Sequence, residues 1–314
     1  MEVVSETMSL LLTFGGSGIK EGEVACRDHR LHISLFSQMT KTLYTFGGSI
    51  WSAAPELAIV ELGYQDGLDV TTKVINLFDG ENCSPSFLEL NPNGTLPTLE
   101  SDGRVYTNTT DVIALLVKDA PVKIRSGSAS IIETIHEEQY DPNFAMFLAR
   151  SDEELNAKSK GIHGVYVSRR QPALERYSQE TEAAKFKAFY DEKLALNTGM
   201  SALFAGKAPA DAKAGYFARS EAHFASVKTA LFEVFPKFLP DNGFIGGPTP
   251  GEEDFHLAPW LTRIAATSGA TSSSDALAAL EVTYGAPVPA KVAAYWGAWT
   301  ARVSWKKVYA DSLR

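Results

Sequence analysis

The sequence predicts two folded domains, an α/β domain with the element order βαβ-ββα followed by an all-α domain. The chain has 314 residues, 45% of them hydrophobic, which is enough to form more than one core. Strand and helix patterns alternate between residues 41 and 117, whereas helical periodicity continues nearly throughout beyond Pro121. We therefore expect the α/β domain at residues 41–122 and the helical domain at residues 130–314.

The fragment TFGGS occurs twice, at residues 13–17 and 45–49, but only the second copy precedes a recognisable fold. The residues after the first copy have no sustained helical period, and charged residues and histidines interrupt strand alternation there. We interpret residues 1–40 as an N-terminal extension rather than an independent domain, or as residues upstream of a natural start at Met39. The fold is expected to begin near Lys41.

A βαβ unit opens the α/β domain. Residues 41–46 alternate as a short strand, residues 55–62 have helical spacing, and Gly63 is placed to end that helix. Residues 68–78 are rich in β-branched side chains and predict a second strand. A helical crossover joins parallel strands, so these two strands should run parallel.

A ββα unit follows. Residues 98–100 and 104–106 predict two short strands joined by a hairpin turn at residues 101–103, and residues 111–117 predict a helix. The order βαβ then ββα is that of a thioredoxin-like domain. In the second domain, the long helical stretches are expected at residues 131–150 and 179–196.

Composition excludes several classes of function. The net charge of −9 argues against nucleic-acid binding, which needs clustered Lys and Arg. Cys26 and Cys83 are the only cysteines, too few for a disulfide scaffold, and they fit a reducing, cytoplasmic compartment. The apolar runs are shorter than the ~20 residues of a membrane span, and a secretory signal is not expected.

Four motifs, in this order and spacing, resemble the soluble glutathione transferases. They are FLELNPNGTLPTL, a polar pair eleven residues after Pro97, FIGGPTPGEEDFHLAPWLTRI and the closing AYWGAWTARVSWKKVY. The resemblance covers about residues 41–309. The long helical domain with KGIHGVYVSRRQPALERY looks most like the fungal-specific, serine-type glutathione transferases of wood-decay fungi, which are related to the bacterial β-etherases.

The resemblance implies that a serine activates glutathione. The glutathione thiol has an ordinary pKa of about 8.5, and only its thiolate is a useful nucleophile. A hydroxyl donor at a helix N-terminus, where free backbone N–H groups point at the sulfur, favours that anion. Ser49 lies fourteen residues before Gly63 and matches the catalytic serine position, with Ser52 as the alternative. Serine in place of the cysteine of some relatives argues against disulfide chemistry.

The same resemblance implies the residues that bind glutathione. The Leu96–Pro97 bond matches the family's cis-proline, which exposes the Leu96 backbone to the cysteinyl part of glutathione. Asn108 and Thr109 occupy the family's Glu-Ser position. Thr109 keeps the hydroxyl for the γ-glutamyl carboxylate, whereas Asn108 lacks the carboxylate expected to bind the γ-glutamyl ammonium group.

The remaining candidates are assigned to the substrate pocket or to structure. Trp51, Tyr166 and Arg169 are candidates for the wall of a hydrophobic site. Asp254 matches a buried helix-capping aspartate, with Gly251 at the N-cap. The histidines have no metal-ligand spacing, so no metal is expected.

These observations predict a cytoplasmic, homodimeric glutathione transferase, with glutathione as co-substrate and an apolar or aromatic electrophile that is conjugated or cleaved. The alternative functions are a carrier of phenolic or aromatic ligands with little turnover, and a regulatory protein of the same fold.

Overall fold

The computed structural model describes residues 41–313. The expectation for residues 1–40, including the first TFGGS copy, lies outside the described residues.

The α/β part is built on a four-stranded sheet of order β2-β1-β3-β4. Its strands are β1 (Lys41–Thr45), β2 (Val70–Val74), β3 (Thr98–Ser101) and β4 (Arg104–Tyr106). As predicted, β1 and β2 are parallel, and β3 and β4 form an antiparallel hairpin. The hairpin turns at Asp102 and Gly103, which both have positive φ, the backbone twist that two-residue hairpins prefer.

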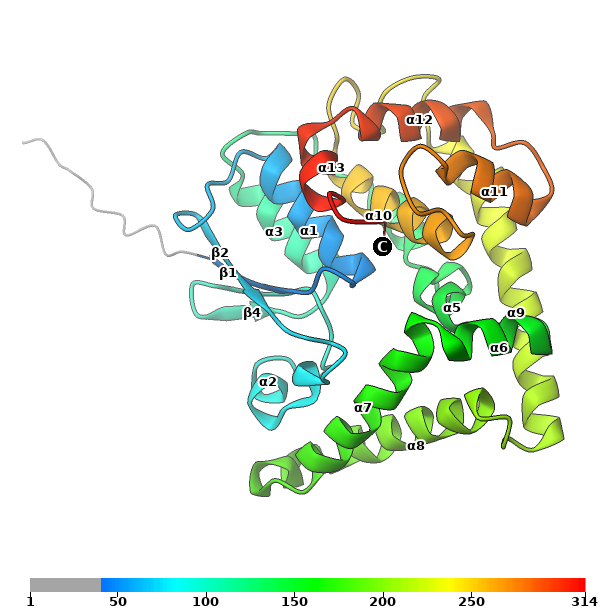
Figure 1. The fold of residues 1–314 in the computed structure, drawn as a ribbon. Coiled ribbons are helices and arrows are strands. Elements are labelled where there is room, and N and C mark those ends of the chain that lie inside the picture. Colours follow the sequence, from blue (N-terminus) through cyan, green and yellow to red (C-terminus); the bar gives the residue numbers. More distant parts are fainter. Residues whose placement is uncertain (1–40, 314) are drawn as a thin grey trace, which may run out of the picture. The chain divides into compact units, whose positions relative to one another are not determined.

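Helices cover both faces of the sheet (Figure 1). On one face lie α1 (Ile50–Glu61) and α3 (Thr109–Asp119), which pack against each other and share a core with the strands. On the other face α2 (Pro85–Leu90) places Phe87 edge-on to Tyr44, with ring centroids 5.9 Å apart. Helix α2 begins shortly after Cys83 and is only six residues long, too short to show a period of its own.

The rest of the described chain is helical. Its α-helices are α4 (Ala129–Ile135), α5 (Pro142–Phe147), α6 (Asp152–Lys160), α7 (Ile162–Ser178), α8 (Lys187–Phe204), α9 (Ala210–Thr229), α10 (Glu252–Thr267), α11 (Ala276–Tyr284), α12 (Ala290–Thr300) and α13 (Val303–Val308). Short 3-10 or π turns are η1 (Glu81–Cys83), η2 (Glu138–Tyr140), η3 (Thr181–Phe186), η4 (Ala230–Val234) and η5 (Phe235–Lys237).

Helix α10 lies at the centre of this arrangement, because it packs against α1 and α3 as well as against α4, α5 and α11. Residues from Glu252 to Ala265 are all buried. A single apolar core therefore runs from the sheet through α1 and α10 into the C-terminal helices.

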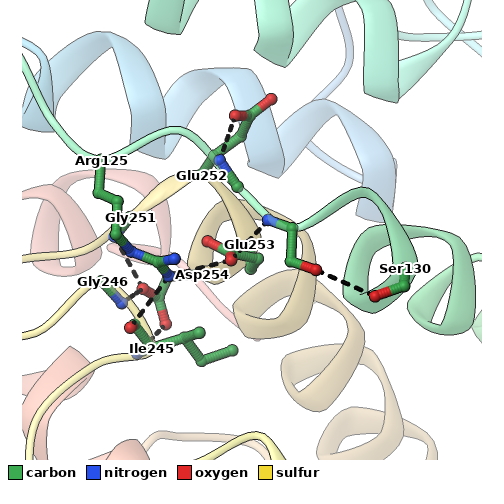
Figure 2. Close-up of polar contacts among 10 residues, drawn as sticks. Arg125, Ser130, Ile245, Gly246, Gly251, Glu252, Glu253 and Asp254 are labelled. Atoms are coloured by element: carbon green, nitrogen blue, oxygen red, sulfur yellow. Dashed lines mark hydrogen bonds and ion pairs between the residues drawn. The ribbon is translucent and has the colours of Figure 1, made fainter.

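Three consecutive carboxylates at the start of α10 fix the surrounding backbone (Figure 2). Glu252 accepts from the Gly127 N–H at 2.7 Å, and Glu253 accepts from the Ser128 N–H at 2.8 Å and from Arg125 at 2.9 Å. Asp254 accepts from the backbone N–H groups of Ile245, Gly246 and Gly251 at 2.7–2.9 Å. We call this set the α10 clamp. It ties the segment before α4 and the loop before α10 to one helix end.

Several predicted elements differ from those observed. Helix α1 begins at Ile50 and runs through Pro55, where the sequence reasoning had started it. The strand predicted at residues 68–78 ends at Val74, since the Asn76 side chain accepts from the Phe78 N–H and turns the chain.

The two long helices predicted in the second domain are also interrupted. The stretch at residues 131–150 is divided because α4 ends at Ile135 and the η2 turn follows. Pro142 then begins α5, and it keeps Asp141, the N-cap, out of the helix. The stretch at residues 179–196 starts as η3, whose spacing of three places Ala183 and Phe186 against the small cluster around Leu88.

Candidate active site at one end of the sheet

The strand register brings three of the predicted motifs to the same end of the sheet. Tyr44 near the end of β1 pairs with Thr98 at the start of β3, and Leu99 pairs with Tyr106 at the end of β4. The turn after β1, the Leu96–Pro97 bond before β3 and the start of α3 after β4 therefore lie at one edge. The Thr95 hydroxyl donates to the Thr107 carbonyl at 3.3 Å and so links the loop before β3 to the segment before α3.

Ser49 is the N-cap of α1. Its backbone N–H donates to the Phe46 carbonyl at 2.8 Å, which closes the Phe46-Gly47-Gly48-Ser49 turn, and its Oγ accepts from the Ser52 N–H at 3.3 Å. Gly48 is constrained by this turn, because a Cβ there would lie 2.8 Å from the Phe46 ring. Ser49 is partly exposed, and within residues 41–313 its hydroxyl proton has no acceptor.

Ser52 has a different environment. Its side chain is fully buried, and its Oγ accepts from the Phe46 N–H at 3.4 Å. Ser52 therefore helps to hold the turn that carries Ser49, and it has no surface at which a ligand could approach.

The Leu96–Pro97 peptide bond is cis. The loop before it is held by the Asn91 side chain, which donates to the Thr95 carbonyl at 3.0 Å and to the Thr98 hydroxyl at 2.8 Å. The sequence reasoning missed this role of Asn91, although an asparagine in the NPNG turn is a typical signal for it. Within the described part of the chain, no hydrogen bond uses the backbone N–H or C=O of Leu96.

Asn108 and Thr109 form the start of α3. Asn108 is the N-cap: its Oδ1 accepts from the Asp111 N–H at 2.8 Å, and its Nδ2 donates to the Asp111 carboxylate at 2.7 Å. Thr109 is the first residue of the helix and is 7% exposed. Among residues 41–313, its hydroxyl and its backbone N–H have no hydrogen-bond partner. Such a helix start can bind an anion.

A row of aromatic side chains extends from this edge toward the helical domain. Phe46 contacts Phe78 at 5.9 Å between ring centroids, Phe78 contacts Tyr166 of α7 at 5.5 Å, and Tyr166 contacts Phe147 of α5 at 5.5 Å. Burial raises the pKa of Tyr166, while the Arg170 guanidinium opposes that rise. Tyr166 therefore remains a neutral phenol at neutral pH.

Two other candidates for the hydrophobic site have structural partners. Arg169 forms an ion pair with Asp79, and both side chains are about half exposed. Trp51 packs against His136 with ring centroids 4.3 Å apart, and His136 Nε2 lies 2.8 Å from His256 Nδ1. The sequence reasoning did not anticipate this histidine pair, since its members are 120 residues apart.

Arg263 of α10 is the main residue near Ser49 that sequence reasoning missed. Its side chain reaches the turn before α1 and donates to the Gly48 carbonyl at 2.9 Å. The signal was an arginine in the mostly apolar run PWLTRIAA, because a buried charge usually has a specific partner.

The positive charges of Lys158 and Arg263 act on the imidazole of His163. Burial is the main cause that lowers the pKa of His163 to about 4, and the two cations lower it further. Lys158 itself donates to the carbonyls of Ala145 and Met146 at 3.1 and 2.5 Å. Burial lowers the pKa of Lys158 to about 8.

Other features carry no comparable chemistry. Cys83 is fully buried, which raises the pKa of its thiol. Between residues 41 and 313, no group of three His, Cys, Asp or Glu side chains could hold a metal, and no helix is long and apolar enough to cross a bilayer. A cavity of about 360 Å³ borders Gly47, Glu56 and Lys307, but Ser49, Leu96 and Thr109 do not line it.

The fold is that of the glutathione transferases: a thioredoxin-like domain followed by a mostly helical region. Two solved structures share it at a TM-score of 0.50. One is the β-etherase LigF from Sphingobium sp. strain SYK-6, at 15% identity over 87% of this chain and 100% of LigF. The other is a glutathione transferase family member from Pseudomonas fluorescens with two glutathione bound, at 13% identity over 88% of this chain and 94% of that protein.

Sequence comparison supports the glutathione S-transferase superfamily. The family model of the glutathione S-transferase N-terminal domain matches residues 43–143. Glutathione S-transferase D7 from Anopheles gambiae is 33% identical over 79 residues, which is 25% of this chain. The match spans about a third of that relative, 34% of its length.

Proposed function

We propose that this protein is a glutathione transferase that uses the Ser49 hydroxyl to hold glutathione as a thiolate. The observation that carries the proposal is the hydrogen bonding of Ser49. Its Oγ accepts from the Ser52 N–H, so the hydroxyl proton remains available to a sulfur anion. The N-terminus of α1 adds the positive end of the helix dipole at the same place.

The glutathione backbone would lie along the same edge of the sheet. The Leu96 N–H and C=O would pair with the cysteinyl residue, and the Thr109 hydroxyl and the start of α3 would bind the γ-glutamyl carboxylate. Asn108 would contribute less than a carboxylate, because both ends of its carboxamide are already bonded to Asp111.

The second substrate would be an apolar or aromatic electrophile. The row of Phe46, Phe78, Tyr166 and Phe147 offers ring faces and edges for an aromatic group. Conjugation or thiolytic cleavage would follow, as in detoxification. A homodimeric assembly, a cytoplasmic location and membership of the fungal, etherase-related serine-type subgroup also belong to this proposal and rest on the resemblance in sequence.

Thiolate absorbance during a pH titration, with glutathione bound, tests the role of Ser49. Ser49→Ala should bind glutathione nearly as well, raise the pKa of its thiol, and reduce turnover about 10²-fold or more because one preorganised donor is lost. Ser52→Ala removes the hydroxyl that accepts from the Phe46 N–H but no donor to the sulfur, so it should change the thiol pKa and turnover much less than Ser49→Ala. Ser49→Cys should shift the protein toward thiol transfer, since a cysteine can attack disulfides.

A carrier of phenolic or aromatic ligands is the second candidate. The observation in its favour is Asn108, whose engaged carboxamide offers no charge to the glutathione ammonium group. The same titration separates the two functions. An unmodified protein that shows no thiolate near neutral pH would support the carrier and contradict the enzyme.

A further inference from the structure

Arg263 fixes the peptide unit that leads into Ser49. Its Nη2 donates to the Gly48 carbonyl oxygen at 2.9 Å. That oxygen and the Ser49 nitrogen belong to the same peptide bond, and the Ser49 N–H donates in turn to the Phe46 carbonyl at 2.8 Å. Both polar atoms of this peptide are therefore held, one by the turn itself and one by a residue 215 positions further along the chain.

The guanidinium also has a second contact that sets its position. Nη1 of Arg263 lies 2.6 Å from the Met146 sulfur of α5, and the residue is only 6% exposed. A guanidinium presents donors in a planar fork and can join two elements at once, which a lysine ammonium on a flexible stem does less well.

The charge of Arg263 affects nearby groups. Burial is the main cause that lowers the pKa of His163, and Arg263 lowers it further together with Lys158. The same guanidinium donates to the Gly48 carbonyl in the turn after β1, so its charge also lies beside Ser49. A positive charge within a few ångströms of an ionisable group favours its anionic form. A thiolate bound at Ser49 would lie in this field.

We propose that Arg263 is a positioning residue for Ser49, and that its guanidinium also stabilises the glutathione thiolate across the domain boundary. The inference rests on the proposed function. It assigns the activation of glutathione to two domains: Ser49 supplies the hydrogen bond from the α/β domain, and Arg263 supplies charge and geometry from α10.

Three variants test the proposal, with thiolate absorbance against pH and steady-state kinetics measured for each. Arg263→Gln removes the charge and should raise the thiol pKa by about 1 unit or more, with about tenfold lower kcat below that pKa and little change in the KM for glutathione. Arg263→Lys keeps the charge without the fork, so its thiol pKa should lie between those of Arg263→Gln and the parent.

Arg302→Gln is the matched control, because Arg302 holds Glu61 at the other end of α1. It should lower the melting temperature and leave the thiol pKa unchanged. The proposal is wrong if Arg263→Gln folds and has the parent's thiol pKa. If Arg263→Gln does not fold, the test passes to Arg263→Lys: the positioning role is wrong if this variant folds and has the parent's thiol pKa. A parent protein without thiolate would overturn the proposed function itself, and this inference with it.

Discussion

Thr109 shows how a single side chain would set the affinity for glutathione. It starts α3 almost fully buried, with a hydroxyl that forms no hydrogen bond within residues 41–313. The next residue, Thr110, has the same side chain but faces solvent. Comparing the two threonines therefore separates the effect of the Thr109 hydroxyl from the effect of replacing any threonine in the first turn of α3.

Thr109→Ala should raise the glutathione dissociation constant by roughly one order of magnitude, because about 1–2 kcal/mol is typical for a lost hydrogen bond to a charged group. Calorimetric titration with glutathione measures this change. Thr110→Ala should bind with the parent's affinity. Equal weakening in both variants would show that helix stability, rather than the Thr109 hydroxyl, controls binding.

At the scale of the element, the α10 clamp determines how firmly α10 is anchored. Asp254 accepts three backbone N–H groups (Figure 2). Asn cannot accept through its amide nitrogen, so Asp254→Asn would leave at least one buried donor unpaired. We expect a loss of about 3 kcal/mol in the free energy of unfolding and a fall of roughly 6–12 °C in melting temperature.

Thermal unfolding at pH 8 checks this expectation. Burial raises the pKa of Asp254 to about 6, so at pH 8 the parent carboxylate is charged. The control is Asp211→Asn in the first turn of α9, where the side chain is exposed and a change below about 0.5 kcal/mol is expected. Similar melting of the two variants would mean that the clamp contributes little.

The predicted elements show what local sequence can and cannot determine. The parallel β1 and β2, the β3–β4 hairpin and the end of α1 before Gly63 follow from periodicity and turn chemistry, which depend on neighbouring residues. Ser49, Leu96 and Thr109 were selected through the family resemblance, and the strand register brings their segments to one edge. Arg263 and the His136–His256 pair could not be found this way, since their partners are brought together by packing over more than 100 residues.

At the scale of the whole molecule, the α/β part and the helical part meet at a pair of neutral histidines. Trp51 of α1 packs on His136, which follows α4, and His136 contacts His256 of α10. Burial lowers the pKa of His136 to about 4, and burial also lowers the pKa of His256 well below its usual value of 6.5. In the unfolded chain both histidines would titrate near 6.5.

This difference makes the protein sensitive to acid. Because the folded pKa values are depressed, the unfolded state binds more protons below pH 6.5, so stability is full above that pH and is lost as the pH falls toward 4. For His136 alone we expect a loss of about 2 kcal/mol between pH 7 and 5. Melting curves over this range measure it.

His136→Gln can still hydrogen-bond to His256 but cannot take up a proton, so its melting temperature should fall less steeply with acidification than the parent's. The melting temperature of each protein is expressed relative to its own value at pH 8. A loss of packing against Trp51 in the variant then cancels, because it is present at every pH. Parallel pH profiles would show that groups other than His136 cause the acid sensitivity.

The central position of α10 also has a consequence for how the protein is made. Helix α1 packs against α10, yet α10 begins about 190 residues after α1 ends. At the usual rate of protein synthesis, ribosomes need roughly 10–40 s to make that stretch. During this time the surface of α1 that α10 will cover is open to water and to other nascent chains. Chains that stop before α10 lack this part of their core, and we expect them to depend on chaperones or to aggregate.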